Sequence, residues 1–281
     1  MKFNLDLGTL AKLNIYVFVP GFIFVKFYKT TLNPSLLLYI ALFFGLYVLA
    51  LYLIVKVLSA VLRLNRAKAT TLNNSVLFFN SGNYGAPVND IVFKGDALAM
   101  SAQVIVLTLQ NLFTFTYGIF AIQSVQVGKL KALLGYFKMP ILYALVIAII
   151  FNYANVPVPK FAWTPLNYLA QAMIPIALIL LGSQIARFKF TFKWTSAYFY
   201  VIIRLIIGPL IALVIIVLLG FHGMIAQALF IASAMPTSVN SSVIAQEYDN
   251  YPELAAQLVF ISTLLSAITV VAVIYLSQII F

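Results

Sequence analysis

Cysteine is absent from the sequence, and charged residues occupy only 8% of its 281 positions. The lack of thiols excludes a disulfide scaffold and cysteine chemistry. Only six residues are acidic and one is a histidine, so the chain is poor in the side chains that bind metals or act as general bases. No metal-ligand spacing, nucleotide-phosphate loop or catalytic triad is visible. The sequence therefore predicts no cofactor, no metal site and no enzyme activity.

Hydrophobic residues make up 64% of the chain, and the mean hydropathy is +1.06. A soluble surface cannot be assembled from this composition. A membrane-spanning helix needs roughly 20 mostly apolar residues. Continuous runs of that kind lie near 35–61, 97–122, 138–158, 165–186, 196–219 and 252–280, with weaker candidates at 10–29, 69–93 and 223–246. The pattern predicts an all-α polytopic membrane protein, with one membrane domain over 1–281 and nine spans. A β-barrel would show short alternating segments instead.

Positive charge collects in some of the connections between these runs. The formal net charge is +11, but Lys and Arg lie in short loops and do not form one basic face, so no nucleic-acid partner is expected. The positive-inside rule predicts that the basic loops face the cytoplasm. One side then holds Lys2, Lys12, Arg63, Arg66, Lys68, Lys129, Lys131, Lys138, Arg187, Lys189 and Lys193, and the other holds Lys26, Lys29, Lys94 and Lys160. With nine spans in the plasma membrane, the N-terminus is expected in the cytoplasm and the C-terminus outside.

The two halves of the chain share an order of features. Pro20 and Pro175 each lie in mid-span, 155 residues apart, and Gln103 and Gln257 each lie early in a span, 154 residues apart. Between these landmarks, each half has one long apolar span and then one weak, polar, proline-bearing span. The matching spans would run in opposite directions, which predicts an inverted repeat of the kind found in secondary transporters.

Repeat one would comprise 1–125 and repeat two 135–281. The span at 138–158 opens the second repeat, and its partner in the first would precede Met1. The repeat therefore predicts a ten-helix fold whose first helix is missing from this sequence. Either the start of the chain is assigned too late, or a helix has been lost.

The two weak spans carry the polar residues from which a binding site could be built. They read "VLFFNSGNYGAPVNDIVF" from Val76 and "FIASAMPTSVNSSVIAQEY" from Phe230. Polar and helix-breaking residues at membrane depth persist where the backbone is buried in protein or lines a cavity. Each segment is therefore expected to be a discontinuous helix, with the restarted half directing its free N–H groups and positive dipole end towards the middle of the protein.

Such an arrangement favours an anion, while the carbonyl ends of the first half-helices could hold a proton or a sodium ion. The alternative is a purely structural role, in which each break is an ordinary kink and the small polar residues pack helices together. The predicted substrate-binding residues are Asn80, Ser81, Asn83, Pro87, Pro236, Ser238 and Asn240.

Four further polar residues within spans are candidates for coupling or for lining the cavity. Asp90 is either a proton-coupling group or a solvated residue near the outer end of its span. Arg204 either extends to the membrane interface or serves a functional site. Gln103 and Gln257 either pack helices together or line the cavity.

At these residues the sequence resembles the auxin efflux carrier family, whose bacterial members include malate and malonate permeases. The resemblance lies in "FNSGNYGAPV", in "YVFVPGFIF" and above all in "AMPTSVNSSVIAQEYDNYPELAAQLVFISTLLS". It implies a ten-helix, two-repeat carrier, often a homodimer, in which crossed, broken helices bind an organic anion and move against a scaffold. Asn80, Pro87, Pro236 and Asn240 match the motif positions. Phe79 stands where plant members have a proline, and Asp90 and the missing first helix also depart from the family pattern.

The function expected from this evidence is a secondary active transporter in the lipid bilayer for small mono- or dicarboxylates such as malate, operating by elevator-type alternating access. Two alternatives remain open. One is a sodium-coupled symporter of the bile-acid type, which acidic residues would favour at the point where the two broken helices cross. The other is a truncated membrane protein that does not transport.

Overall fold

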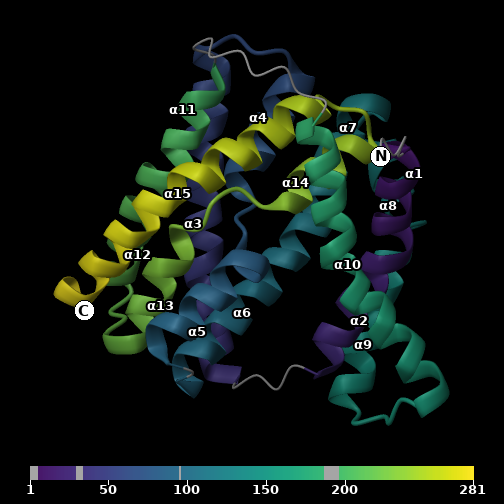
Figure 1. Cartoon of the computed structure of the whole chain (residues 1–281), viewed down its shortest axis with the longest axis horizontal. Helices are drawn as coiled ribbons and strands as arrows, with labels where there is room; N and C mark the ends of the chain where they lie inside the picture. The colour runs from purple at the N-terminus through teal and green to yellow at the C-terminus, as the bar shows by residue number, and fades with distance from the viewer. Residues whose placement is uncertain (1–5, 30–33, 95, 187–195) are drawn as a thin grey trace.

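The computed structural model describes residues 6–29, 34–94, 96–186 and 196–281, and within these ranges all regular secondary structure is helical (Figure 1). Its elements are α1 (Leu7–Leu13), η1 (Asn14–Phe18), α2 (Val19–Lys29), α3 (Pro34–Val61), α4 (Arg66–Leu77), η2 (Ser81–Gly85), α5 (Ala86–Phe93), α6 (Ala97–Phe113), η3 (Thr114–Gly118), α7 (Ile119–Val127), α8 (Lys129–Tyr136), α9 (Pro140–Tyr153), α10 (Lys160–Ala186), α11 (Ser196–Ile202), η4 (Ile203–Ile207), α12 (Gly208–Leu218), α13 (Gly223–Ser233), α14 (Val239–Glu247) and α15 (Pro252–Ile280). Of the basic residues that predict the topology, Lys2, Arg187, Lys189 and Lys193 lie outside the described residues.

Six helical segments are long and apolar enough to cross a membrane. They are Leu7–Lys29, Ser35–Val61, Leu98–Val127, Lys160–Leu180, Ala197–Leu218 and Pro252–Ile280. Two shorter apolar helices are α9, which covers less than the span expected at 138–158, and α13. The chain is therefore an all-α polytopic membrane protein, while the count of nine crossings stays a prediction.

The two polar spans are each built in two pieces, as the sequence predicts. The first stops at the end of α4 and resumes at η2, which continues into α5. The second stops at the end of α13 and resumes at α14. The intervening residues, 78–80 and 234–238, have to satisfy their backbone groups without a helix, because water is scarce at membrane depth.

Buried apolar side chains form two clusters. The first cluster draws mainly on α3, α4, α6, α11, η4, α12, α13 and α15. The second draws mainly on α1, η1, α2, α7, α9, α10 and α14. Figure 1 shows α1, α2, α9 and α10 on one side of the molecule, α3, α12, α13 and α15 on the other, and α14 between them. The interior is thus divided into two bodies that meet near the second broken helix.

Three of the described π-helical turns, η1, η2 and η4, have the same local cause. Each ends two residues before a proline, which is Pro20, Pro87 or Pro209. Proline has no N–H, and its ring crowds the carbonyl four residues earlier, so a regular α-helical turn cannot form there. A widened π-turn accommodates the ring, and such turns are frequent at functional sites.

Candidate functional site

The two helix breaks meet and pair with each other through their backbones. The Asn80 N–H donates to the Pro236 carbonyl at 2.8 Å, and the Ser238 N–H donates to the Phe78 carbonyl at 2.7 Å. Between these bonds, Phe79 and Thr237 form an isolated antiparallel bridge. A short piece of β-structure therefore satisfies the backbone where both helices are interrupted. We call residues 78–80 and 234–238 the crossing.

Side chains complete the hydrogen bonding of the crossing. The Thr237 hydroxyl donates to the Ser75 carbonyl at 2.8 Å, and the Thr237 N–H donates to the Ser262 hydroxyl at 3.1 Å. All three residues are at most 2% exposed. The crossing is thus held by α4 on one side and by α15 on the other.

Each restarted helix has an N-cap of the expected type. The Asn80 side chain accepts from the Asn83 N–H at 3.2 Å, and the Ser238 hydroxyl accepts from the Asn240 N–H at 3.3 Å. Asn and Ser are strongly preferred at this position because they satisfy helix donors that have no intrahelical partner. The remaining N–H groups of the first turns leave positive ends at both restarts.

Neither proline begins a restarted helix. The first restarted helix begins at Ser81, and Pro87 is the second residue of α5. Pro236 lies inside the crossing and not in the first turn of α14. Its carbonyl accepts from Asn80, and its missing N–H leaves no donor unsatisfied there.

A cavity of about 120 Å³ lies beside the crossing, where both restarted helices begin. It is lined by Phe22, Lys26, Phe79, Asn80, Ser81, Gly82, Asn83, Ala86, Leu107, Gln110, Asn111, Met173, Ile174, Ser238, Val239 and Asn240. Five of the seven predicted binding residues are in this set, and Pro87 and Pro236 are not. The structure therefore brings Asn80, Ser81, Asn83, Ser238 and Asn240 together, while their role in binding stays a prediction.

The cavity has a polar mouth and a buried floor. Lys26 and Asn83 are exposed, whereas Gln110, Asn111 and Met173 are buried. The Gln110 Oε1 atom is buried and, among the described residues, has no hydrogen-bond partner. Leaving such an acceptor unpaired costs about 1–3 kcal/mol, which a polar ligand or water in the cavity would relieve.

Lys26 is the one charged side chain among the described residues that line the cavity. It comes from α2, three residues before the end of that helix. The sequence interpretation assigned it to a loop and missed it. A lysine within the apolar stretch "GFIFVKFY" was the available signal.

The other four candidates lie away from the cavity. Gln103 is buried and donates to the Ser81 carbonyl at 2.7 Å and accepts from Asn89 at 2.5 Å, so it packs η2 against α6. Gln257 lines a separate cavity of about 430 Å³ with Asp249 and Glu253 among others. Asp90 is exposed on α5. Arg204 is fully buried and does not extend to the interface.

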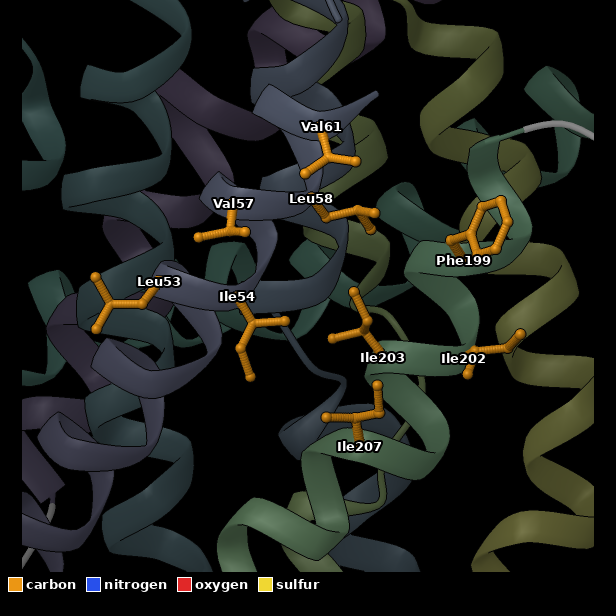
Figure 2. A pocket seen from close by; sticks show the side chains of 9 residues that line it. All are labelled: Leu53, Ile54, Val57, Leu58, Val61, Phe199, Ile202, Ile203 and Ile207. Atoms are coloured by element: carbon orange, nitrogen blue, oxygen red, sulfur yellow. The ribbon is translucent and has the colours of Figure 1, made fainter. Parts of the chain in front are cut away.

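A third hollow, which is apolar, is larger than both cavities described above. A groove of about 510 Å³ lies between α3 and the helix formed by α11 and η4, and Figure 2 shows its aliphatic and aromatic side chains. Its lining residues are Leu53, Ile54, Val57, Leu58, Val61, Phe199, Ile202, Ile203 and Ile207. An anion in this groove would have no polar partner, so it is a poor candidate for the site that the crossing forms.

A polytopic helical protein with two broken helices paired at a polar cavity has the architecture of a membrane carrier. Residues 125–275, more than half of the chain, match the model of the family described as membrane transport protein. The chain belongs to this family, which is the auxin efflux carrier family that the sequence motifs indicated.

Several relatives support the same assignment. An "Uncharacterized transporter" of Methanothermobacter thermautotrophicus is 27% identical over 94% of this chain and 87% of its own length. The "Uncharacterized transporter YfdV" of Escherichia coli K12 is 27% identical over 71% of this chain and 65% of its own length. A "Putative malonate transporter" of Rhizobium meliloti is 31% identical over 40% of this chain and 35% of its own length. The family and these names indicate a transporter and not an enzyme.

Proposed function

We propose that the protein is a secondary active transporter for small dicarboxylates such as malonate or malate. The observation that carries the proposal is the cavity beside the crossing. Two helix N-termini, capped by Asn80 and Ser238, open on it, and Asn83 and Asn240 add amide donors. Helix N-termini and amide groups together suit a carboxylate.

Lys26 favours a dicarboxylate over a monocarboxylate. The helix N-termini can bind one carboxylate, and a lysine at the mouth provides a positive charge for a second. A cavity of about 120 Å³ suits a small acid, since a cavity of about 150 Å³ holds benzene. The relative named as a malonate transporter is consistent with this size and charge.

Elevator-type movement is supported by where the cavity lies. Phe22 and Met173 belong to the second apolar cluster, whereas Phe79 belongs to the first. A ligand in the cavity therefore contacts both bodies. Displacement of the crossing relative to α2 and α10 would carry a ligand held there past the side chains of these two helices.

The sodium-coupled symporter of the bile-acid type is less well supported. That alternative predicts acidic residues at the crossing. The described lining of the cavity contains no Asp or Glu, and Asp90 is exposed on α5.

The test is binding to the purified full chain in lipid nanodiscs, measured by calorimetry with malonate and with propionate. Malonate is expected to bind more tightly than propionate. Lys26→Met should lower malonate affinity about two- to fivefold, within the range for an exposed ion pair, and leave propionate affinity unchanged. Lys29→Met is the matched control, because Lys29 lies on the same helix and contacts the Trp163 ring instead of the cavity.

Uptake of labelled malonate by proteoliposomes then tests transport itself. A chain that binds neither acid and moves neither across the membrane would refute the proposal. Equal losses of malonate and propionate affinity in Lys26→Met would refute the dicarboxylate assignment alone.

A further inference from the structure

Arg204 lies in the middle of a membrane helix and is 0% exposed. Its Nη1 donates to the Val76 carbonyl at 2.9 Å. Its Nη2 donates to the Tyr47 hydroxyl at 2.5 Å and also to the Ser233 carbonyl. Val76 and Ser233 lie at the C-terminal ends of α4 and α13, the two first half-helices. One guanidinium group therefore binds the ends of both helices that stop at the crossing.

The C-terminal end of a helix has a partial negative charge and up to four carbonyls without intrahelical partners. In the described structure all eight such carbonyls have partners. In α4, Asn74 accepts from the Phe78 N–H, Ser75 from Thr237, Val76 from Arg204 and Leu77 from Gln110. In α13, Phe230 accepts from the Ser233 hydroxyl, Ile231 from the Ala234 N–H, Ala232 from the Met235 N–H, and Ser233 from Arg204 and Tyr47. The protein's own donors thus take up the carbonyls that could coordinate a sodium ion.

Arg204 supplies the only charged donor in this set. Its charge also faces two aromatic rings, because Cζ lies 5.1 Å from the centroid of Phe79 and 5.7 Å from that of Tyr47. The faces of such rings attract cations. Carbonyls and rings together stabilise a cation that would otherwise be costly at this depth.

No carboxylate neutralises this charge within the protein. All six Asp and Glu residues lie in the described ranges, none of them is buried, and none accepts a hydrogen bond from Arg204. Phe79 both contacts Arg204 and lines the cavity. An anion in the cavity and the guanidinium would therefore share the Phe79 ring as a neighbour, and the anion would supply a counter-charge that no hydrogen-bonded carboxylate of the protein supplies.

We propose that Arg204 is a fixed cation that occupies the position of a coupling ion at the crossing, so that anion binding requires no sodium ion. The statement about anion binding rests on the proposed function, whereas the placement of Arg204 at the ends of the two half-helices does not. Arg204 acts through the half-helix ends and through its charge, without touching the ligand, and is therefore a positioning residue.

The first measurement is malonate binding to the full chain in nanodiscs, in sodium chloride and in choline chloride. The wild type should bind equally well in both. Arg204→Gln removes the charge and retains a donor, so its affinity should fall about tenfold, while Arg204→Lys should retain most of the affinity. Wild-type binding that requires sodium, or unchanged affinity in Arg204→Gln, would overturn the proposal.

The second measurement needs no substrate. Removing the side chain in Arg204→Ala leaves room for a small cation between the half-helix ends. Millimolar guanidinium chloride should therefore raise the unfolding temperature of Arg204→Ala relative to the same salt's effect on the wild type, because a ligand that binds the folded state stabilises it. Arg66→Ala is the matched control, since Arg66 is exposed and donates to Ser124 far from the crossing.

Arg204→Ser, which also leaves this space open, replaces Arg204→Ala in this measurement if the alanine variant does not fold. Absence of a specific effect of guanidinium would overturn the fixed-cation assignment. If guanidinium stabilises the variant but the wild type binds no carboxylate, the assignment stands and the proposed substrate is wrong.

Discussion

The backbone N–H of Asn80 donates to the carbonyl of Pro236 at 2.8 Å, joining two residues that are 156 positions apart in the chain. This bond places the end of one broken helix against the other. Asn80 also caps the helix that restarts at Ser81. One residue therefore serves the crossing with its main chain and the helix N-terminus with its side chain, while that side chain also lines the cavity.

Replacing Asn80 or Asn240 by Ala removes an amide that lines the cavity. A hydrogen bond to a charged group contributes about 1.5–3 kcal/mol, so malonate affinity should fall about ten- to a hundredfold in each variant. The two losses should not be additive in the double variant, because both side chains would contact one ligand. Calorimetry in nanodiscs measures this, with Asn167→Ala as control, since Asn167 lies on α10 outside the cavity lining. Wild-type affinity in both single variants would show that these residues only pack helices.

Pro236→Ala should abolish malonate binding and leave expression intact. The substitution provides an N–H that can donate to the Ala232 carbonyl, which allows α13 to continue into the crossing. The continued helix would displace the carbonyl of residue 236, which accepts the hydrogen bond from the Asn80 N–H. Binding and size-exclusion profiles measure the outcome, and Pro252→Ala, at the N-terminus of α15, is the control. Normal binding by a folded Pro236→Ala protein would contradict this prediction.

Gly118→Ala should lower the free energy of unfolding by about 1–3 kcal/mol. A Cβ atom at Gly118 would lie 2.7 Å from ring atoms of Phe78, so the ring or the helix has to shift. Phe78 belongs to the crossing, and malonate affinity should therefore fall as well. At Gly45 a Cβ atom meets nothing within 4 Å, so Gly45→Ala should not destabilise the protein. Denaturant or thermal unfolding in detergent distinguishes the two variants, and equal stabilities would refute the packing argument.

The segment around Lys131, which is helix α8 in the structure, should lie on the cytoplasmic side and Phe281 outside the cell. The Arg66 side chain donates to Ser124 at 3.1 Å, so the start of α4 and the end of α7, which adjoin two basic segments, lie at the same end of the molecule. The chain has no cysteine, so Lys131→Cys and Phe281→Cys each introduce a single thiol. An impermeant maleimide should label position 281 in intact cells and position 131 only after permeabilisation. Labelling of position 131 in intact cells would show that the orientation is opposite to the predicted one.

Composition and the length of the continuous apolar runs were sufficient for the fold class. The continuous apolar runs predicted helices such as α3 and α15, because only a helix satisfies the backbone of a long lipid-exposed segment internally. The polar runs after Val76 and before Glu247 predicted both helix breaks, because polar, helix-breaking segments at membrane depth persist only where the protein or a cavity surrounds them. The prolines were less informative about where each helix restarts, because Pro87 and Pro236 act on local backbone geometry whereas Asn80 and Ser238 supply the caps.

The cavity could be predicted only in part. Asn80, Ser81, Asn83, Ser238 and Asn240 belong to the two breaks and were identified from local sequence. Lys26 was assigned to the outer side by the distribution of basic residues. It was not predicted to line the cavity, because α2 is far from both breaks in the chain and only packing brings it there. Gln103 was ambiguous between lining and packing until its bonds to Ser81 and Asn89 were seen.

By itself the sequence determined that the chain is a helical membrane protein, where its helices are interrupted and which polar groups those interruptions expose. These properties depend on the transfer of local segments between water and lipid, which composition and spacing describe. Only the tertiary structure decided that Asn80 pairs with Pro236, that Lys26 reaches the cavity and that Arg204 binds the ends of α4 and α13. Such contacts join residues on different helices, up to 156 positions apart for Asn80 and Pro236, and they follow from how whole helices pack, which no local pattern in the chain records.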